Sequence, residues 1–120
     1  MKKALVVDDN GSNLTLEKDL LEIAGYQVFV AEDASSGIAI ARKEKPDVIL
    51  MDVRLPDMRG SEAALIIRHD KEILDIPIIF VTASVMAEGK EEIKNIRNSG
   101  FIGKPINTRT FAKEIGQYIK

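Results

Sequence analysis

Four short, unbroken apolar runs constrain most strongly what this chain can fold into. They span residues 4–7, 28–30, 48–51 and 78–81, and a weaker fifth run lies at 101–102. A strand with one face in water alternates apolar and polar residues, whereas a strand buried on both faces is apolar throughout. The runs therefore predict a parallel sheet with helices packed on each face.

Segments with helical length and spacing follow each run. They span residues 12–24, 34–44, 60–69, 87–98 and 108–119. Strands that alternate with helices predict right-handed crossovers and an open parallel sheet. At this chain length the pattern fits an α/β fold of the flavodoxin-like (βα)5 type, with strand order 2-1-3-4-5 and helices on both faces. We expect residues 1–120 to form one domain.

The helix boundaries are predicted from capping residues. Ser12 and Asp33 are expected to cap the first two helices, and Gly25 should stop the first one. Either Asn107 or Thr108 should begin the last helix.

Composition excludes several classes of function. The net charge is -2, and the basic residues are interspersed with acidic ones, so no basic stripe for nucleic acid appears. No segment approaches the roughly 18 apolar residues of a membrane span. The chain has no cysteine, which rules out disulfides and thiolate metal sites. These features favour a cytoplasmic globular domain.

Polar residues follow the apolar runs at the point where each strand should end. Asp8 and Asp9 follow the first run, Asp52 the third, Thr82 the fourth and Lys104 the fifth. The carboxyl ends of parallel strands meet at one edge of a sheet, so these side chains should lie together. Crowded carboxylates raise one another's pKa, and a hard divalent cation such as Mg²⁺ relieves their repulsion.

This set of groups suits phosphoryl chemistry. A carboxylate can attack phosphorus to form an aspartyl phosphate, while an ammonium and a hydroxyl can bind the phosphoryl oxygens. A single aspartate at a strand end is often only a helix cap or a turn residue. The prediction therefore rests on the convergence of the whole set.

The motifs around these residues resemble those of the receiver domains of two-component response regulators. They are VVDDN at 6–10, ILMDVRLPDMRG at 49–60, VTAS at 81–84 and GKPI at 103–106. The resemblance covers essentially the whole chain. It implies a phospho-acceptor signalling switch, not a turnover enzyme, with a phosphohistidine on a histidine kinase or phosphotransfer domain as the donor.

The resemblance also implies the phosphorylation and metal sites. Asp52 is the residue that accepts the phosphoryl group. Mg²⁺ is held by Asp9, Asp52 and the backbone carbonyl of Arg54, and Asp8 binds the metal mainly through water.

Further positions are implied to transmit the signal. Lys104 and Thr82 bind the phosphoryl group, and Phe101 occupies the place of an aromatic residue that swings between exposed and buried states. Pro105 matches the position of a cis peptide bond, which is essentially a proline option. The surface of residues 87–119 should then bind a downstream protein or support onward relay. A monomer and a weak homodimer through the last two helices are both compatible with the sequence.

Two other functions would share parts of this pattern. A Mg²⁺-dependent phosphatase with an aspartyl phosphate intermediate usually has a second aspartate two residues after the nucleophile, but Arg54 stands there. A degenerate receiver that only binds partners is disfavoured because the full acidic, hydroxyl and lysine set is present. The resemblance implies that Arg54 and Ser84 occupy positions that tune water access to the phosphoryl group, and we hypothesise that the long Arg54 side chain slows hydrolysis.

Overall fold

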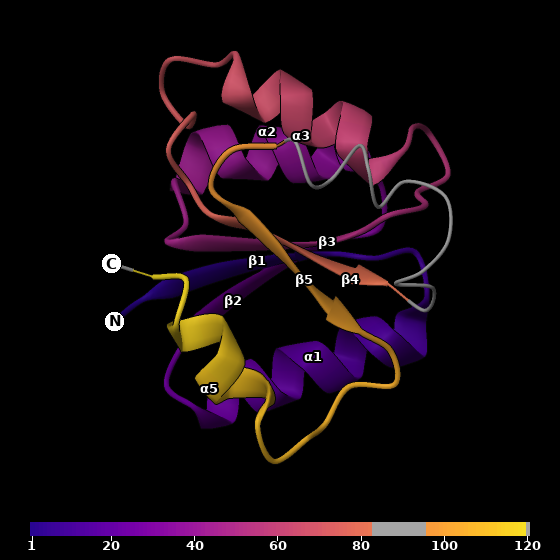
Figure 1. The fold of residues 1–120 in the computed structure, drawn as a ribbon, viewed down its shortest axis with the longest axis vertical. Coiled ribbons are helices and arrows are strands. Elements are labelled where there is room, and N and C mark those ends of the chain that lie inside the picture. The colour runs from indigo at the N-terminus through magenta and orange to yellow at the C-terminus, as the bar shows by residue number, and fades with distance from the viewer. Residues whose placement is uncertain (83–95, 120) are drawn as a thin grey trace.

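The computed structural model describes residues 1–82 and 96–119, which build a five-stranded parallel sheet between two layers of helices (Figure 1). The strand order is β2-β1-β3-β4-β5, and it confirms the predicted flavodoxin-like arrangement. Helices α2 and α3 cover one face of the sheet, and α1 and α5 cover the other (Figure 1). The strands are β1 (Lys3–Val7), β2 (Gln27–Ala31), β3 (Val48–Asp52), β4 (Ile78–Thr82) and β5 (Ser99–Gly103), and the helices are α1 (Gly11–Ile23), α2 (Ala34–Glu44), α3 (Gly60–Arg68) and α5 (Phe111–Gly116).

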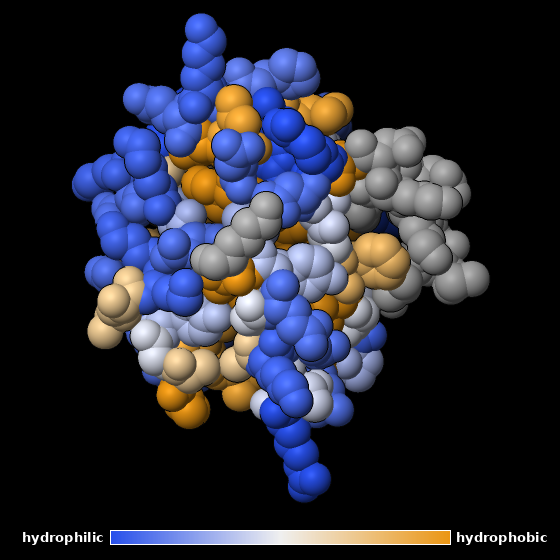
Figure 2. Space-filling model, turned by 60° about the vertical axis from the view of Figure 1, so that its left-hand side comes forward, coloured by the Kyte–Doolittle hydropathy of each residue, from blue (hydrophilic) through white to orange (hydrophobic). Residues whose placement is uncertain are grey.

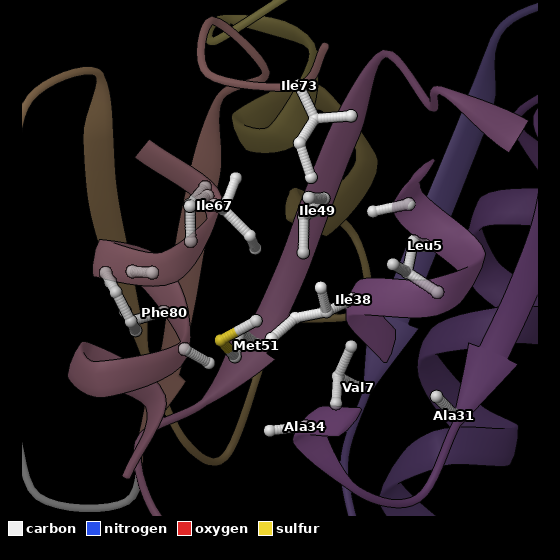
Figure 3. Packing of buried hydrophobic residues seen from close by; sticks show 14 of the residues in the cluster. Leu5, Val7, Ala31, Ala34, Ile38, Ile49, Met51, Ile67, Ile73 and Phe80 are labelled. Atoms are coloured by element: carbon white, nitrogen blue, oxygen red, sulfur yellow. The ribbon is translucent and has the colours of Figure 1, made fainter. Parts of the chain in front are cut away.

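The continuous apolar runs are explained by burial on both faces of the sheet. Successive side chains of a strand point to opposite faces. Leu5 and Val7 of β1 therefore join the hydrophobic cluster under α2 and α3, in which Ile49, Met51 and Phe80 also lie (Figure 3). Their neighbours in each strand join a second cluster under α1 and α5, which contains Ala4, Val6, Val48, Leu50, Ile79, Val81, Phe111 and Ile115.

The first two helices begin and end close to their predicted limits. The cap of α1 is Asn10, not Ser12: the Asn10 side chain accepts a hydrogen bond from the Asn13 N–H, which places the cap two residues earlier. Gly25 follows the helix with a φ of 100°, a left-handed conformation that glycine adopts without strain. Asp33 caps α2 as predicted, by accepting from the Ser36 N–H.

The last helix is shorter than its predicted range of 108–119. Asn107 accepts backbone hydrogen bonds from Thr110 and Phe111, so residues 107–110 form a turn. Beyond Gly116 the chain continues with i to i+3 hydrogen bonds, including Tyr118 N–H to the Ile115 carbonyl. Glycine is a poor helix former, and this accounts for the change from α-helical to tighter i to i+3 hydrogen bonding after Gly116. The predicted helix over 87–98 lies outside the described residues except for 96–98, which form a turn.

The surface is mixed in character. Figure 2 brings forward the side on which the two termini lie in Figure 1, and apolar residues appear there as small groups among hydrophilic ones. Within the described ranges, none of the helices combines the length and apolar character that a lipid bilayer would require.

Candidate functional site

The strand register gathers the predicted polar residues at the carboxyl edge of the sheet. Asp8 follows β1, Asp52 ends β3, Thr82 ends β4 and Lys104 follows β5. In the ladders, Asp52 pairs with Val81 and Thr82 with Gly103. One carboxylate oxygen each from Asp8, Asp9 and Asp52 lie within 4.8 Å of one another. The convergence inferred from strand ends is thus present in the structure.

Asp8 is the most firmly held of the three aspartates. Its side chain is 2% exposed, and its backbone N–H extends the β1–β2 ladder by donating to the Ala31 carbonyl at 3.0 Å. The Asn10 N–H donates to Oδ1 at 2.8 Å, and the Lys104 Nζ donates to Oδ2 at 3.0 Å. Both oxygens of this buried carboxylate are therefore compensated. Asp9, in contrast, is exposed.

Lys104 approaches the acidic residues from the end of β5. Its backbone N–H donates to the Thr82 carbonyl at 2.7 Å, and the following peptide bond to Pro105 is cis. The Nζ lies 3.0 Å from the Asp8 Oδ2 and 3.4 Å from the Asp52 Oδ2. Burial alone lowers the pKa of Lys104, but the hydrogen bond and charge of Asp8 and the charge of Asp52 outweigh it and hold the pKa above its usual value.

Asp52 is half-buried between these groups. Burial raises the pKa of its carboxyl group, and the neighbouring Asp8 charge adds to this, although Lys104 and a hydrogen bond from the Arg54 N–H act in the opposite direction. That N–H donates to Oδ1 at 3.3 Å, and Arg54 is an exposed residue. Ionised Asp52 therefore gains from any additional positive charge brought to this edge.

The two residues expected to transmit a signal occupy neighbouring strands. Thr82 is 9% exposed at the end of β4, and Phe101 is 38% exposed on β5, the strand at the edge of the sheet. In the ladder Phe101 pairs with Phe80, two residues before Thr82. The aromatic side chain is thus in a largely outward position. Ser84 and residues 87–95 of the expected output surface lie outside the described residues.

Glu17 was missed by sequence reasoning. It is 2% exposed and lies on the buried stripe of α1 with Leu14 and Leu21. Burial, and then the charge of Asp8, raises the pKa of Glu17 to about 7. The spacing of Leu14, Glu17 and Leu21 was the available signal, because positions three and four apart share a helix face.

The donor set suits magnesium. Three carboxylates lie within bridging distance of one another, and hard oxygen ligands of this kind are what Mg²⁺ prefers. Lys104 supplies one positive charge against Asp8, Asp9, Asp52 and the nearby Glu17, so the edge of the sheet holds an excess of acidic groups. A divalent cation at this position would offset that excess.

Known proteins share both the sequence and the fold. The response regulator receiver domain, as a family model, matches residues 4–116. The polar-differentiation response regulator DivK of Brucella anthropi is 35% identical over 118 residues, covering 98% of this chain and 96% of that protein. The chemotaxis response regulator CheY4 of Vibrio cholerae superposes with a TM-score of 0.92 at 34% identity, covering 99% of both chains.

A further neighbour bears on the acidic cluster. The receiver domain of a sensor histidine kinase from Pseudomonas aeruginosa superposes with a TM-score of 0.90 at 27% identity, covering 98% of this chain and 96% of its own, and that structure has a magnesium ion coordinated in its active-site cleft. The likeness in sequence, fold and acidic edge leads to one conclusion. The chain belongs to the response regulator receiver family, the phosphoryl-accepting switches of two-component signalling.

Proposed function

We propose that Asp52 is the phosphoryl acceptor of this receiver and that residues 1–120 act as one switch unit. The observation that carries the proposal is the position of the Asp52 carboxylate, which lies in the acidic cluster at the end of β3 and 3.4 Å from the Lys104 Nζ. The phosphoryl donor is a phosphohistidine of a histidine kinase or phosphotransfer protein.

The phosphoryl transfer exchanges one bond to phosphorus for another. A carboxylate oxygen of Asp52 forms a bond to phosphorus, the bond between phosphorus and the imidazole nitrogen breaks, and that nitrogen keeps the electron pair. Lys104 and the Thr82 hydroxyl bind phosphoryl oxygens through charge and hydrogen bonding. Loss of the phosphoryl group to water would reset the switch, and this makes the protein a signalling switch instead of a metabolic enzyme.

Mg²⁺ would be held by Asp9, Asp52 and the Arg54 carbonyl, with Asp8 acting through water. When bound, the ion supplies positive charge to the phosphoryl oxygens. The assignment of Asp8 to the outer position is supported by its burial and by the Asn10 and Lys104 hydrogen bonds that already occupy both of its oxygens.

Output follows from a shift between two pre-existing surfaces. Thr82 moves toward the phosphoryl group, and Phe101 moves from its outward position into the space that Thr82 leaves. This changes the surface of residues 87–119, which binds a downstream target protein or supports relay.

The test is phosphorylation by acetyl phosphate with Mg²⁺, followed by mass spectrometry of the intact protein. The wild type should gain the mass of one phosphoryl group, and Asp52→Asn should not. Asp19→Asn, a change of an exposed aspartate on α1, is the matched control and should be labelled like the wild type. Equal labelling of Asp52→Asn and the wild type would refute the assignment, and sustained turnover of phosphoesters would favour a phosphatase.

A further inference from the structure

The loop that joins β3 to α3, residues 53–59, leaves the sheet directly after Asp52 and carries the carbonyl of Arg54. Its base is closed: the Gly60 N–H donates to the Val53 carbonyl at 2.7 Å, and Arg54 pairs with Arg59 in an antiparallel bridge. Movement of this loop would therefore displace the carbonyl of Arg54 and the Arg54 N–H that donates to the Asp52 Oδ1 at 3.3 Å.

The tip of the loop is attached to a different part of the fold. The Asp57 carboxylate accepts hydrogen bonds from the Ala34 and Ser35 N–H groups, each at 2.9 Å, and from the Ser35 hydroxyl at 2.8 Å. The first N–H groups of a helix have no partner within the helix. Asp57 satisfies two of them at the start of α2, and these bonds lower the pKa of Asp57 to about 2. The carboxylate is thus ionised and bound at neutral pH.

A second aspartate at the same helix end provides a comparison. Asp33 accepts from the Ser36 N–H at 2.8 Å, but it directly precedes α2 and holds only its own helix. Both aspartates cap α2, and both carry their charge near the carboxyl edge of the sheet. Only Asp57 connects that helix to the loop after Asp52.

We propose that Asp57 is a positioning residue, which fixes the β3–α3 loop to α2 and thereby holds the Asp52 carboxylate and the Arg54 carbonyl in place for Mg²⁺. The proposal rests on the magnesium site of the proposed function. Asp57 does not bind the ion itself, because its oxygens are engaged by α2. Leu55 and Met58 pack against the core on either side of the tip, so the loop should stay folded but lose its fixed position when Asp57 is removed.

The experiment compares Asp57→Ala with Asp33→Ala. Each change removes one negative charge and one cap of α2, so both should lower the melting temperature, by roughly 5 °C. Mg²⁺ affinity is measured by isothermal titration calorimetry at constant ionic strength. Asp57→Ala should weaken Mg²⁺ binding about tenfold, as loss of a group that orients metal ligands typically does. Asp33→Ala should bind Mg²⁺ like the wild type.

Amide hydrogen exchange without Mg²⁺ gives a readout that is independent of the metal. Residues 53–59 should exchange faster in Asp57→Ala than in Asp33→Ala. Equal Mg²⁺ affinity and equal loop exchange in the two variants would overturn the inference. If Asp57→Ala is unfolded, Asp57→Asn, which keeps one acceptor oxygen, takes its place with the same criteria. A wild type that binds no Mg²⁺ would overturn the proposed function, and loop exchange would still decide whether Asp57 fixes the loop.

Discussion

Replacing Glu17 by glutamine should stabilise the metal-free protein at alkaline pH far more than at acidic pH. Burial, followed by the charge of Asp8, raises the pKa of Glu17 from 4.5 to about 7. Because the pKa is higher in the folded than in the unfolded state, the folded protein binds this proton more tightly. The contribution to stability is complete below the unfolded pKa and is lost as the pH rises through the folded pKa.

The magnitude follows from the pKa difference. A rise from 4.5 to about 7 corresponds to about 3 kcal/mol, at about 1.4 kcal/mol for each pKa unit. Glutamine has nearly the same size and polarity as glutamate, but it carries no charge to desolvate. The gain in free energy of unfolding should therefore be about 3 kcal/mol at about pH 8 and under about 1 kcal/mol at about pH 5.

The assay is urea unfolding with EDTA present, followed by far-UV circular dichroism because the chain has no tryptophan. The difference between the gains in free energy of unfolding at the two pH values does not contain any pH-independent cost of burying the amide. Glu22→Gln is the matched control on the same helix. The Glu22 carboxylate is exposed and paired with Lys18, so its removal should give no gain that grows with pH. A gain for Glu17→Gln that is equal at both pH values would refute the reasoning.

Three other changes test the packing and the site. Phe111→Ala removes a fully buried side chain of α5 that packs in the cluster between this helix, α1 and the sheet, and it should cost about 3–5 kcal/mol in urea unfolding. In Gly60→Ala the new methyl group would meet the Asp52 carbonyl, so the variant should lose both stability and Mg²⁺ affinity by calorimetry, whereas Gly11→Ala, with open space around it, should lose neither. Arg54→Ala should shorten the lifetime of the phosphorylated protein in a dephosphorylation time course, and an unchanged lifetime would contradict the proposed shielding role.

The sheet was predictable because burial on two faces leaves a strong signal in sequence. The runs at 48–51 and 78–81 could hardly form anything but central strands, since each is apolar on both faces and too short for a buried helix. The site was predictable for a related reason. Parallel strands deliver their carboxyl ends to one edge, so Asp52 and Lys104 could be placed together without any knowledge of side-chain packing.

Two of the features that sequence reasoning missed, at Asp57 and at Glu17, depend on contacts between elements distant in the chain. Aspartate is an ordinary residue type for a turn, and nothing in the sequence of residues 53–59 indicates that the Asp57 carboxylate caps α2. The shorter last helix depends on local competition by the turn at Asn107, which periodicity does not detect. Glu17 lies on an apolar stripe, but its burial follows from how α1 meets the acidic edge, and the pattern of a single helix does not include that edge.

The arrangement around Lys104 also explains how the site can take an additional charged group without leaving a buried charge uncompensated. In the proposed function, phosphorylation of Asp52 would add negative charge to the end of β3, and the Lys104 ammonium, 3.4 Å from that carboxylate, should move toward the new oxygens. Asp8 would then lose its ion pair with Lys104. Because Asp8 is only 2% exposed, leaving its buried charge without that partner would by itself be destabilising. The Asn10 N–H, which donates to the other Asp8 oxygen at 2.8 Å, remains in place because α1 fixes it. Lys104 could therefore change partners by a movement of its own side chain while Asp8 stays hydrogen-bonded.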